Sequence, residues 1–337
     1  MRRRELPTAF HATAPLRLDF AGGWTDVPPF SVREGGVVVN AAIGLRARVE
    51  LQLGGKLLRL VSEELGDTLE CANSAGLVPG GRLPLLTAAL RMFPVLGGFT
   101  LTTRCDAPTG SGLGSSGALG VALVGALTRA RQDSVSPRDI ADQAWQVETI
   151  EAQLPGGKQD QYGAALGGFH RLSFRDPDVG IEPLTLDPAF LSALEHQTLI
   201  CYTNKSRVSG DTISRVMGAY ERGDPNVTGA LRALKDTGNA MVEALRAADL
   251  GRVGALLSEN WKHQQALDPG MRTREMAQLE EAADKAGTLG GKAAGAGAGG
   301  SMFFVMKRDA REAAPVLTGA GAQVLPLSWA MEGVRTW

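Results

Sequence analysis

The chain of 337 residues is long enough for two domains, or for one large domain with an added lobe. Apolar residues make up 44% and charged residues 21%, which excludes a wholly disordered or fibrous protein. The 35 Lys and Arg are balanced by 36 Asp and Glu. Because the chain carries almost no net charge, we do not expect a nucleic acid or an acidic membrane as its partner.

The longest apolar stretch, at 117–128, is shorter than the roughly 20 residues of a membrane-spanning helix, so we expect no membrane segment. The N-terminal residues lack the unbroken apolar segment of a secretory signal, which predicts a cytoplasmic protein. Cys71, Cys105 and Cys201 are odd in number and far apart, which favours reduced packing cysteines over disulfides or a zinc site.

In chain order, residues 14–67 are expected to form strands, because β-branched and alternating apolar residues recur between glycines. Helix formers with apolar spacings of three and four then predict helices at 83–93, 117–132 and 136–154. The last of these helices opens with Ser136 as a capping residue and Pro137 in its first turn.

The second half of the sequence changes from strand to helix and back. Residues 211–286 are predicted to be mainly helical, with breaks at 223–229 and 267–273. Strands are expected on both sides, at 170–176, 196–203, 301–307 and 322–329. Because helices cluster instead of alternating with strands, we expect an α+β fold, and a Pro- and Asp-rich stretch near 180–190 divides it into domains at 1–185 and 186–337.

Residues 107–120 form a glycine-rich segment between a predicted strand and a predicted helix. Small residues let successive backbone N–H groups point at one place, and the helix N-terminus adds partial positive charge, so the segment suits phosphate. The hydroxyls of Ser111, Ser115 and Ser116 suit a divalent cation that bridges nucleotide phosphates.

Two other interpretations of this segment stay open. Gly112, Gly114 and Gly117 also satisfy the dinucleotide pattern G-x-G-x-x-G, although the segment does not lie in a first βαβ unit. A flexible turn between strand and helix is the simpler alternative. A Walker-type loop is excluded, because the chain nowhere contains G-x-x-x-x-G-K-[ST].

Three further segments are candidates for ligand binding. Residues 287–305 run through a second glycine-rich stretch into an apolar strand, although close packing of a strand against a helix also calls for small residues. In 17–30, Asp26 beside Trp24 on a stiff loop suits a polyol, whereas a loop Asp more often caps backbone N–H groups. In 154–168, a single acid, Asp160, follows a Gly-Gly turn, where solvated loop acids are also common.

Together these segments resemble the GHMP kinase superfamily, named for galacto-, homoserine, mevalonate and phosphomevalonate kinases, from about Ala14 to Phe304. Residues 14–30 are similar to its first motif, 108–120 to its second and 292–301 to its third. Within the superfamily, "AGGWTDVPP" and "GGKQDQYGAALGG" most resemble the branch of heptose-phosphate kinases and fucokinases, which phosphorylate the anomeric hydroxyl of a sugar. Gly23 and Trp24 replace the Glu-His pair of galactokinase, which argues against galactose.

The resemblance implies an ATP-binding loop and a site for Mg²⁺. The phosphates of ATP would lie on Gly110, Ser111, Gly112, Leu113, Gly114, Ser115, Ser116 and Gly117. Ser116 and Glu148 would bind Mg²⁺, Asp160 matches the catalytic aspartate, and Arg17 matches the basic residue near the reacting hydroxyl.

The resemblance also implies contacts to the acceptor. Trp24, Thr25 and Asp26 would bind the sugar, and the third motif would approach it through Gly295 and Gly297. A sugar that already carries a remote phosphate needs a cationic pocket. Lys205 and Arg207 are the candidates for it, with solvated surface charge as the alternative.

The implied fold is an N-terminal α+β domain with the first two motifs and a ferredoxin-like C-terminal domain with the third. The implied function is an ATP-dependent sugar kinase acting on a small-molecule sugar or sugar phosphate, with D-glycero-D-manno-heptose 7-phosphate as the preferred acceptor. The alternatives are a fucokinase, a mevalonate- or homoserine-type kinase, and a catalytically silent sensor of a sugar or nucleotide.

Overall fold

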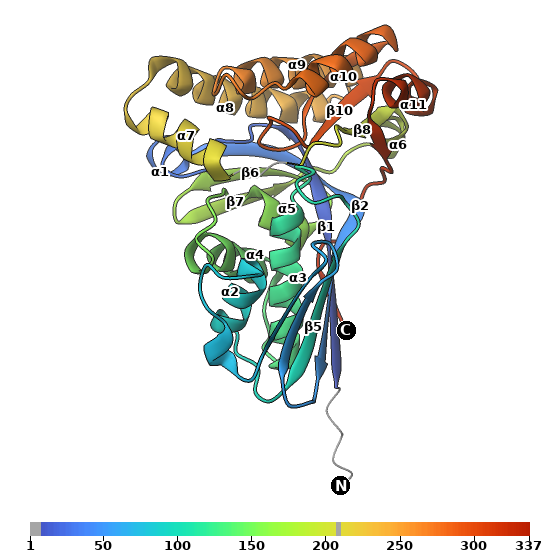
Figure 1. The fold of residues 1–337 in the computed structure, drawn as a ribbon. Coiled ribbons are helices and arrows are strands. Elements are labelled where there is room, and N and C mark those ends of the chain that lie inside the picture. The colour runs from blue at the N-terminus through green and yellow to red at the C-terminus, as the bar shows by residue number, and fades with distance from the viewer. Residues whose placement is uncertain (1–7, 207–209) are drawn as a thin grey trace.

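The computed structural model describes residues 8–206 and 210–337. Within them, one large sheet and one small sheet are each covered by helices, which is the α+β architecture expected from the sequence. Figure 1 shows the large sheet, built mainly from the blue to green part of the chain, below a lobe built from the yellow to red part.

The large sheet has the strand order β12-β1-β2-β5-β3-β4, with β6 paired to the first part of β2 and β7 paired to β6. Among its described strand pairs, only β3 and β5 run parallel. The elements are β1 (Ala9–Ala21), α1 (Phe30–Glu34), β2 (Gly36–Leu53), β3 (Leu58–Ser62), β4 (Asp67–Cys71), a 3₁₀ turn (Ser74–Gly76), α2 (Pro84–Met92), β5 (Phe99–Cys105), α3 (Ser115–Ala130), α4 (Pro137–Gln146), a π-helical turn (Val147–Glu151), α5 (Gln159–Leu166), β6 (Phe169–Arg175), β7 (Asp178–Pro183) and β12 (Arg335–Thr336).

Helix α3 is the centre of the helical layer beside this sheet. Every residue from Gly117 to Thr128 is buried, because the helix lies between β1 and β2 on one side and α4 and α5 on the other. Figure 1 shows α3 running alongside β1 and β5. The longest apolar stretch of the sequence is therefore a core helix.

Helix α4 begins as the sequence predicts. The Ser136 hydroxyl accepts a hydrogen bond from the backbone N–H of Asp139, and Pro137 occupies the first turn. The end of the helix was not predicted: it widens into the π-helical turn Val147–Glu151. Such turns are frequent at functional sites, and this one carries Glu148.

The small sheet is antiparallel, with the order β11-β8-β10-β9. In chain order this is fourth, first, third, second, so the expected ferredoxin-like C-terminal domain is confirmed. Its elements are α6 (Pro188–Gln197), β8 (Thr198–Tyr202), α7 (Gly210–Glu221), α8 (Pro225–Arg246), α9 (Leu250–Gln265), α10 (Arg274–Lys285), β9 (Thr288–Ala293), β10 (Ser301–Met306), α11 (Ala310–Gly319) and β11 (Gln323–Leu325).

Two details of the second half differ from the sequence prediction. The helical region has a third break, between α8 and α9, where Asp249 caps the new helix by accepting from the N–H of Arg252. The strand expected at 322–329 is confined to β11, and Trp329 instead packs on Phe169 of β6. Both predicted breaks in helix are present, but the first is shorter than 223–229 because α8 already begins at Pro225.

The two halves of the molecule share their hydrophobic cores. Phe303 of β10 belongs to the core beside the large sheet, while Trp24 and Phe30 belong to the core under the C-terminal helices. The C-terminus returns to the large sheet, where β12 pairs with β1 and Trp337 stacks on His11. The proposed domain division at residue 185 therefore stays a prediction.

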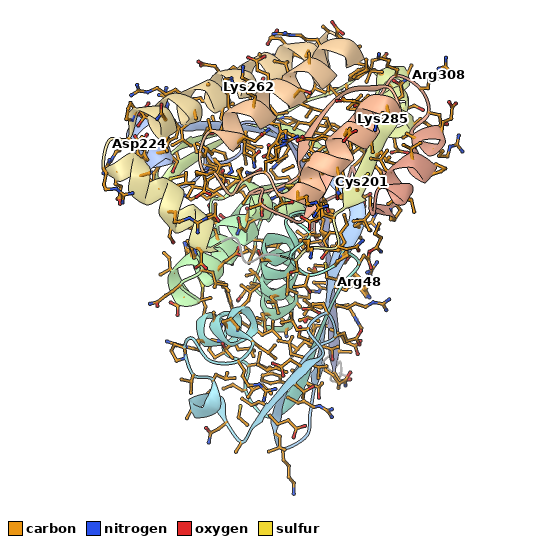
Figure 2. The ribbon with its side chains drawn as sticks, turned by 45° about the horizontal axis from the view of Figure 1, so that its top comes forward. Arg48, Cys201, Asp224, Lys262, Lys285 and Arg308 are labelled. Carbon is orange, nitrogen blue, oxygen red and sulfur yellow. The ribbon has the colours of Figure 1, made fainter. Side chains whose placement is uncertain are left out.

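Charged side chains such as Lys262, Lys285 and Arg308 lie on the outside of the helical lobe, as Figure 2 shows, whereas Cys201 is buried in β8. All three cysteines are free thiols. No helix in the described part of the chain is both long and apolar enough to cross a membrane.

Candidate active site

The glycine-rich loop of the second motif bends through a series of left-handed residues. Gly110, Gly112 and Gly114 have φ angles of 72°, 75° and 77°, which non-glycine residues rarely adopt. Gly114 then serves as the N-cap of α3 and offers no side chain to its first turn. The free N–H groups of that turn and its partial positive charge are suited to phosphate, as the sequence predicts.

Arg17 of β1 is the residue that joins the three motifs. Its Nε donates to Asp160 at 2.8 Å, and its Nη1 donates to the carbonyl oxygens of Gly112 at 2.7 Å and Ala294 at 3.0 Å. Its backbone N–H also donates to the carbonyl of Leu113. A single buried guanidinium therefore fixes the phosphate loop, the third motif and the candidate catalytic acid relative to one another.

Asp160 lies in the first turn of α5, at the point where that helix meets α3. Its side chain is 27% exposed, so the carboxylate that Arg17 orients is still accessible. A Cβ on Gly117 would lie 2.5 Å from the Cβ of Asp160, closer than real Cβ atoms approach. Glycine at 117 is therefore what allows the second motif to lie directly against the candidate catalytic residue.

Glu148 faces the same place from the π-helical turn. Gln161 donates to its carboxylate, and the Ser116 hydroxyl is hydrogen-bonded to it. Burial raises the pKa of Glu148 to about 7, opposed by the hydrogen bonds from Ser116 and Gln161 and aided by the charge of Asp160. A hydroxyl and a carboxylate with unmet negative charge are suitable oxygen ligands for Mg²⁺.

The third motif closes over the second. The Ser301 N–H donates to the carbonyl of Ser111 at 2.7 Å, and a Cβ on Gly295 would lie 2.5 Å from the oxygen of Gly112. A Cβ on Gly297 would collide with the sulfur of Met271. These close approaches explain the small residues of the loop, whereas contact of Gly295 and Gly297 with an acceptor stays a prediction.

The loop of the first motif is packed more tightly than the sequence suggested. Thr25 is fully buried, and its hydroxyl donates to Gly22 and accepts from the N–H of Val37. This hydroxyl closes the loop onto β2 and is not exposed to a sugar in this structure, so the expected contact of Thr25 with a sugar stays a prediction. Trp24 is 5% exposed and belongs to the C-terminal core, which leaves little indole surface for a ring.

Asp26 is buried beneath the turn that precedes α5. Its oxygens accept from the backbone N–H of Gln159 at 3.0 Å and from its side-chain amide at 3.3 Å, and a Cβ on Gly157 would overlap them. Burial raises the pKa of Asp26 to about 6, opposed by the Gln159 N–H and aided by the charges of Asp160 and Asp19. Asp26 thus holds the residue next to Asp160, and a direct contact with sugar stays a prediction.

The residues proposed for a remote phosphate lie at the surface. Lys205 is exposed, and its Nζ is 3.8 Å from a carboxylate oxygen of Glu275. Arg207 lies outside the described residues. The structure therefore leaves this pocket a prediction.

An ion pair inside the site was not predicted from the sequence. Lys292 of β9 is fully buried and lies 3.0 Å from a carboxylate oxygen of Asp19, and it also donates to the Asp19 carbonyl at 2.7 Å. Burial lowers the pKa of Lys292, and the charge of Asp19 opposes this. Asp19 follows Arg17 by two positions on β1, a spacing that places both on one face of the strand and was the available signal.

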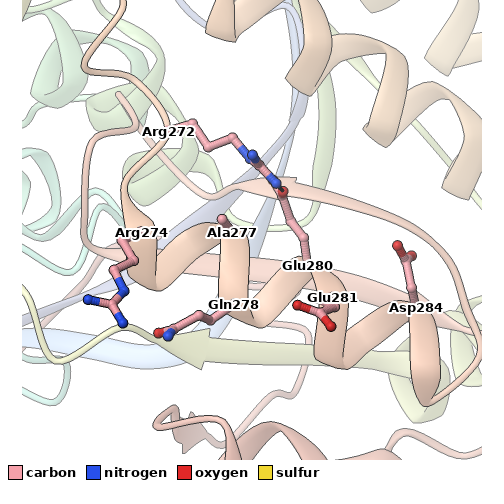
Figure 3. Close-up of a pocket in the computed structure, with 7 residues that line it drawn as sticks. All are labelled: Arg272, Arg274, Ala277, Gln278, Glu280, Glu281 and Asp284. Atoms are coloured by element: carbon pink, nitrogen blue, oxygen red, sulfur yellow. Dashed lines mark hydrogen bonds and ion pairs between the residues drawn. The ribbon is translucent and has the colours of Figure 1, made fainter.

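One hollow on the described surface lies away from these residues. It measures about 430 Å³ along α10 and is lined by Arg272, Arg274, Ala277, Gln278, Glu280, Glu281 and Asp284, which Figure 3 shows. The lining carries none of the three motifs. This hollow therefore lies outside the candidate active site.

Comparison with known families agrees with this geometry. The model of the GHMP kinase N-terminal domain matches residues 84–168, and that of the GHMP kinase C-terminal domain matches 241–322. A D-glycero-alpha-D-manno-heptose 7-phosphate kinase from Campylobacter jejuni is 30% identical over 334 residues, covering 96% of this chain and 97% of that protein. A bifunctional fucokinase/GDP-fucose pyrophosphorylase from Arabidopsis thaliana is 28% identical over 325 residues, covering 89% of this chain and 30% of that longer protein.

Solved structures show the same fold. A D-glycero-D-manno-heptose 1-phosphate kinase from Bacteroides thetaiotaomicron superposes with a TM-score of 0.80 at 25% identity, covering 97% of this chain and 98% of that one. A galactokinase from Lactococcus lactis superposes with a TM-score of 0.76 at 19% identity, covering 97% and 95%.

The two sheets, the three motifs and the Arg17–Asp160 pair define a phosphotransferase, and the chain belongs to the GHMP kinases. It is accordingly an ATP-dependent enzyme that transfers a phosphoryl group to an alcohol.

Proposed function

We propose that this kinase phosphorylates the anomeric hydroxyl of a sugar or sugar phosphate. The observation that carries the proposal is the Arg17 guanidinium, which binds the carboxylate of Asp160 and the carbonyl of Gly112 and so holds the acid beside the phosphate loop. D-glycero-D-manno-heptose 7-phosphate is the first acceptor to test, because a relative that matches nearly the whole chain is named for that substrate.

Phosphoryl transfer requires little covalent chemistry from the protein, so alignment and charge compensation supply most of the acceleration. Asp160 orients the acceptor hydroxyl and accepts its proton. Arg17 keeps Asp160 in place and offsets negative charge on the transferring group. The N–H groups between Gly110 and Gly117 bind the phosphates of ATP.

Ser116 and Glu148 are the proposed ligands of Mg²⁺, which when bound neutralises charge on the phosphate oxygens. The hydroxyl presents one oxygen from the start of α3, and the carboxylate presents others from the π-helical turn. Gln161 holds the Glu148 carboxylate in place by donating to its Oε2.

Lys205 and Arg207 remain the proposed partners of a remote phosphate on the acceptor. The exposed pair of Lys205 with Glu275 is long enough that a phosphate can compete for the ammonium. Fucose, which carries no phosphate, would make no use of these cations. We further propose that the enzyme acts in the cytoplasm, where phosphorylated sugars and ATP are both present.

The acceptor is tested by measuring ADP release from ATP with heptose 7-phosphate, mannose, fucose and mevalonate. We expect turnover with a sugar and none with mevalonate. A catalytically silent sensor releases no ADP with any of them, and turnover with mevalonate alone overturns the sugar kinase assignment.

The mechanism is tested by Asp160→Asn. We expect turnover to fall about 100-fold or more, in line with loss of a general base, while ATP affinity is retained. Asp133→Asn, at an exposed acid after α3, is the control and should change neither. Near-normal turnover of Asp160→Asn would remove the proposed role of Asp160.

A further inference from the structure

Four polar side chains surround the turn at Gly22 and Gly23, and we call them the polar cluster: Asp19, Asn40, Gln159 and Asn260. They come from β1, β2, α5 and α9, and none is more than 8% exposed. Burying so many polar groups is costly unless each finds a partner.

Contacts place the four residues together. The Gly22 N–H donates to Asn260 Oδ1 at 2.9 Å. A Cβ on Gly23 would lie 2.0 Å from Asp19 Oδ2 and 3.3 Å from Gln159 Nε2. Asn40 is the strand partner of Asp19, and its Nδ2 donates to the carbonyl of Gln159 at 3.0 Å.

Each side chain in the cluster uses one polar atom to hold its position and leaves another unpaired. Lys292 binds Asp19 Oδ2, Gln159 Nε2 binds Asp26, Asn40 Nδ2 binds Gln159, and Asn260 Oδ1 binds Gly22. The remaining atoms are buried without a hydrogen-bond partner among the described residues: Asp19 Oδ1, Asn40 Oδ1, Gln159 Oε1 and Asn260 Nδ2.

The bonds that are made also identify the free atoms chemically. A side-chain amide donates only through its nitrogen and accepts only through its oxygen, so the bond that one atom makes identifies the other, unpaired atom as acceptor or donor. Asn40, Gln159 and Asp19 therefore offer three acceptors, and Asn260 offers one donor. Hydroxyl groups, which donate and accept, complement this set, whereas a carboxylate or phosphate can only accept.

The charges nearby also argue against an anion, because each nearby cation already has a carboxylate partner. Arg17 is paired with Asp160, Lys292 with Asp19, and Lys158, next to Gln159, is 3.4 Å from Asp176. Asp26 adds a further carboxyl group, which binds Gln159. No cation in this part of the described chain is left over for an anionic group of the acceptor.

We infer that the polar cluster binds the non-reacting hydroxyl groups of the acceptor, and that it selects a neutral polyol portion over an acyclic alcohol that carries a carboxylate. The inference rests on the proposed sugar kinase function. Gln159 and Asn260 act as specificity-determining residues, because Gln159 immediately precedes Asp160 on α5 and Asn260 is held by the Gly22 N–H of the first-motif turn. A site built in this way penalises an analogue that lacks the matching hydroxyl.

The first test is Gln159→Met, which removes the free Oε1 and the long Nε2 contact to Asp26 but keeps the shorter bond from the backbone N–H to Asp26. We expect the KM of the sugar acceptor to rise about tenfold or more, the size of one lost hydrogen bond in a desolvated site, and the KM of ATP to stay within about twofold. The matched control is Gln143→Met on α4, whose Oε1 is also buried without a described partner but lies outside the cluster. It should change neither constant.

The second test needs no variant and therefore does not depend on folding. Monodeoxy analogues of the accepted sugar are compared with the parent, and we expect at least one to lose about tenfold in kcat/KM with the wild-type enzyme. In Gln159→Met that analogue and its parent should become nearly equal. Equal losses in both enzymes, or an unchanged acceptor KM in the variant, overturn the inference and leave the cluster to bind water.

Failure of the proposed function is distinguishable from this outcome. If the wild type phosphorylates no sugar, calorimetric titration with heptose 7-phosphate, mannose and fucose tests the cluster alone. Binding that weakens in Gln159→Met and not in Gln143→Met supports the inference, and absence of binding to the wild type overturns it.

Discussion

The proposed nucleotide side and the proposed acceptor side of this active site are built by different means. The nucleotide side is a continuous stretch, Gly110–Gly117, in which backbone N–H groups and missing side chains form the surface. The acceptor side is assembled from single buried polar side chains of β1, β2, α5 and α9, and its buried charge, Asp19, is paired with Lys292 of β9. One side therefore depends on backbone shape and the other on buried polar and charged side chains. Substitutions on the first side should mainly impair catalysis, and substitutions on the second should mainly change stability.

Removing one charge from the acceptor side should have the largest effect on stability. Lys292→Met leaves Asp19 buried without its cation, which should lower the free energy of unfolding by about 3–5 kcal/mol. Asp19→Asn combined with Lys292→Met should recover part of this, because no unpaired charge remains. Urea denaturation checks both variants. Lys285→Met, at the exposed pair with Glu281, is the control and should leave stability nearly unchanged.

The acceptor side should also make stability depend on pH. The folded pKa of Asp26 is about 6 against 3.8 for the free group, so its protonation stabilises the fold at low pH and that contribution is lost as the pH rises through 6. The free energy of unfolding of Asp26→Asn, compared with that of the wild type, should therefore rise by roughly 3 kcal/mol between about pH 4 and pH 7.

Urea denaturation at several pH values measures this gain. Asp309→Asn serves as the control, because its pairing with Arg311 lowers the Asp309 pKa to about 2. The contribution of Asp309 to stability is lost only as the pH falls toward 2. The difference in free energy of unfolding between Asp309→Asn and the wild type should therefore stay nearly constant between about pH 4 and pH 7. A constant offset for Asp26→Asn as well would contradict the burial argument.

On the nucleotide side, adding one methyl group should impair catalysis. Gly117→Ala pushes α3 away from Asp160, and a shift of about 1 Å in a catalytic group costs about 100-fold in turnover. Gly120→Ala, one turn further along α3, meets only Ala144 at 3.6 Å and should be tolerated. Steady-state kinetics of the two variants compare them directly, and equal turnover would show that close approach at 117 is not required.

The smallest predicted effect concerns Glu148, where the two sides meet. Its pKa of about 7 means that turnover at limiting Mg²⁺ should fall about tenfold between pH 8 and pH 6, as the carboxylate takes up a proton. Saturating Mg²⁺ should shift the midpoint to lower pH. Glu148→Gln should abolish that shift, and a pH profile that does not respond to Mg²⁺ would remove Glu148 from the metal site.

The sequence by itself determined the features that depend on neighbouring residues. The Ser136 cap, the buried helix at 117–128 and the left-handed glycines of the second motif follow from backbone geometry and hydrogen bonds within a few positions. The resemblance of the motifs further predicted that Arg17, Glu148 and Asp160 belong to one site. In the structure Arg17 binds Asp160, and the charge of Asp160 helps to raise the pKa of Glu148, so the three lie near one another while their roles stay a prediction.

Only the tertiary structure decided the rest of the acceptor side. Thr25 proved to hold its own loop, Lys292 proved to neutralise Asp19, and Asn260 proved to face Gly22. The last two contacts join residues 273 and 238 positions apart. Such pairs form only when both sheets are packed together, because a side chain's local sequence sets its strand or helix face but not the partner that burial brings to it.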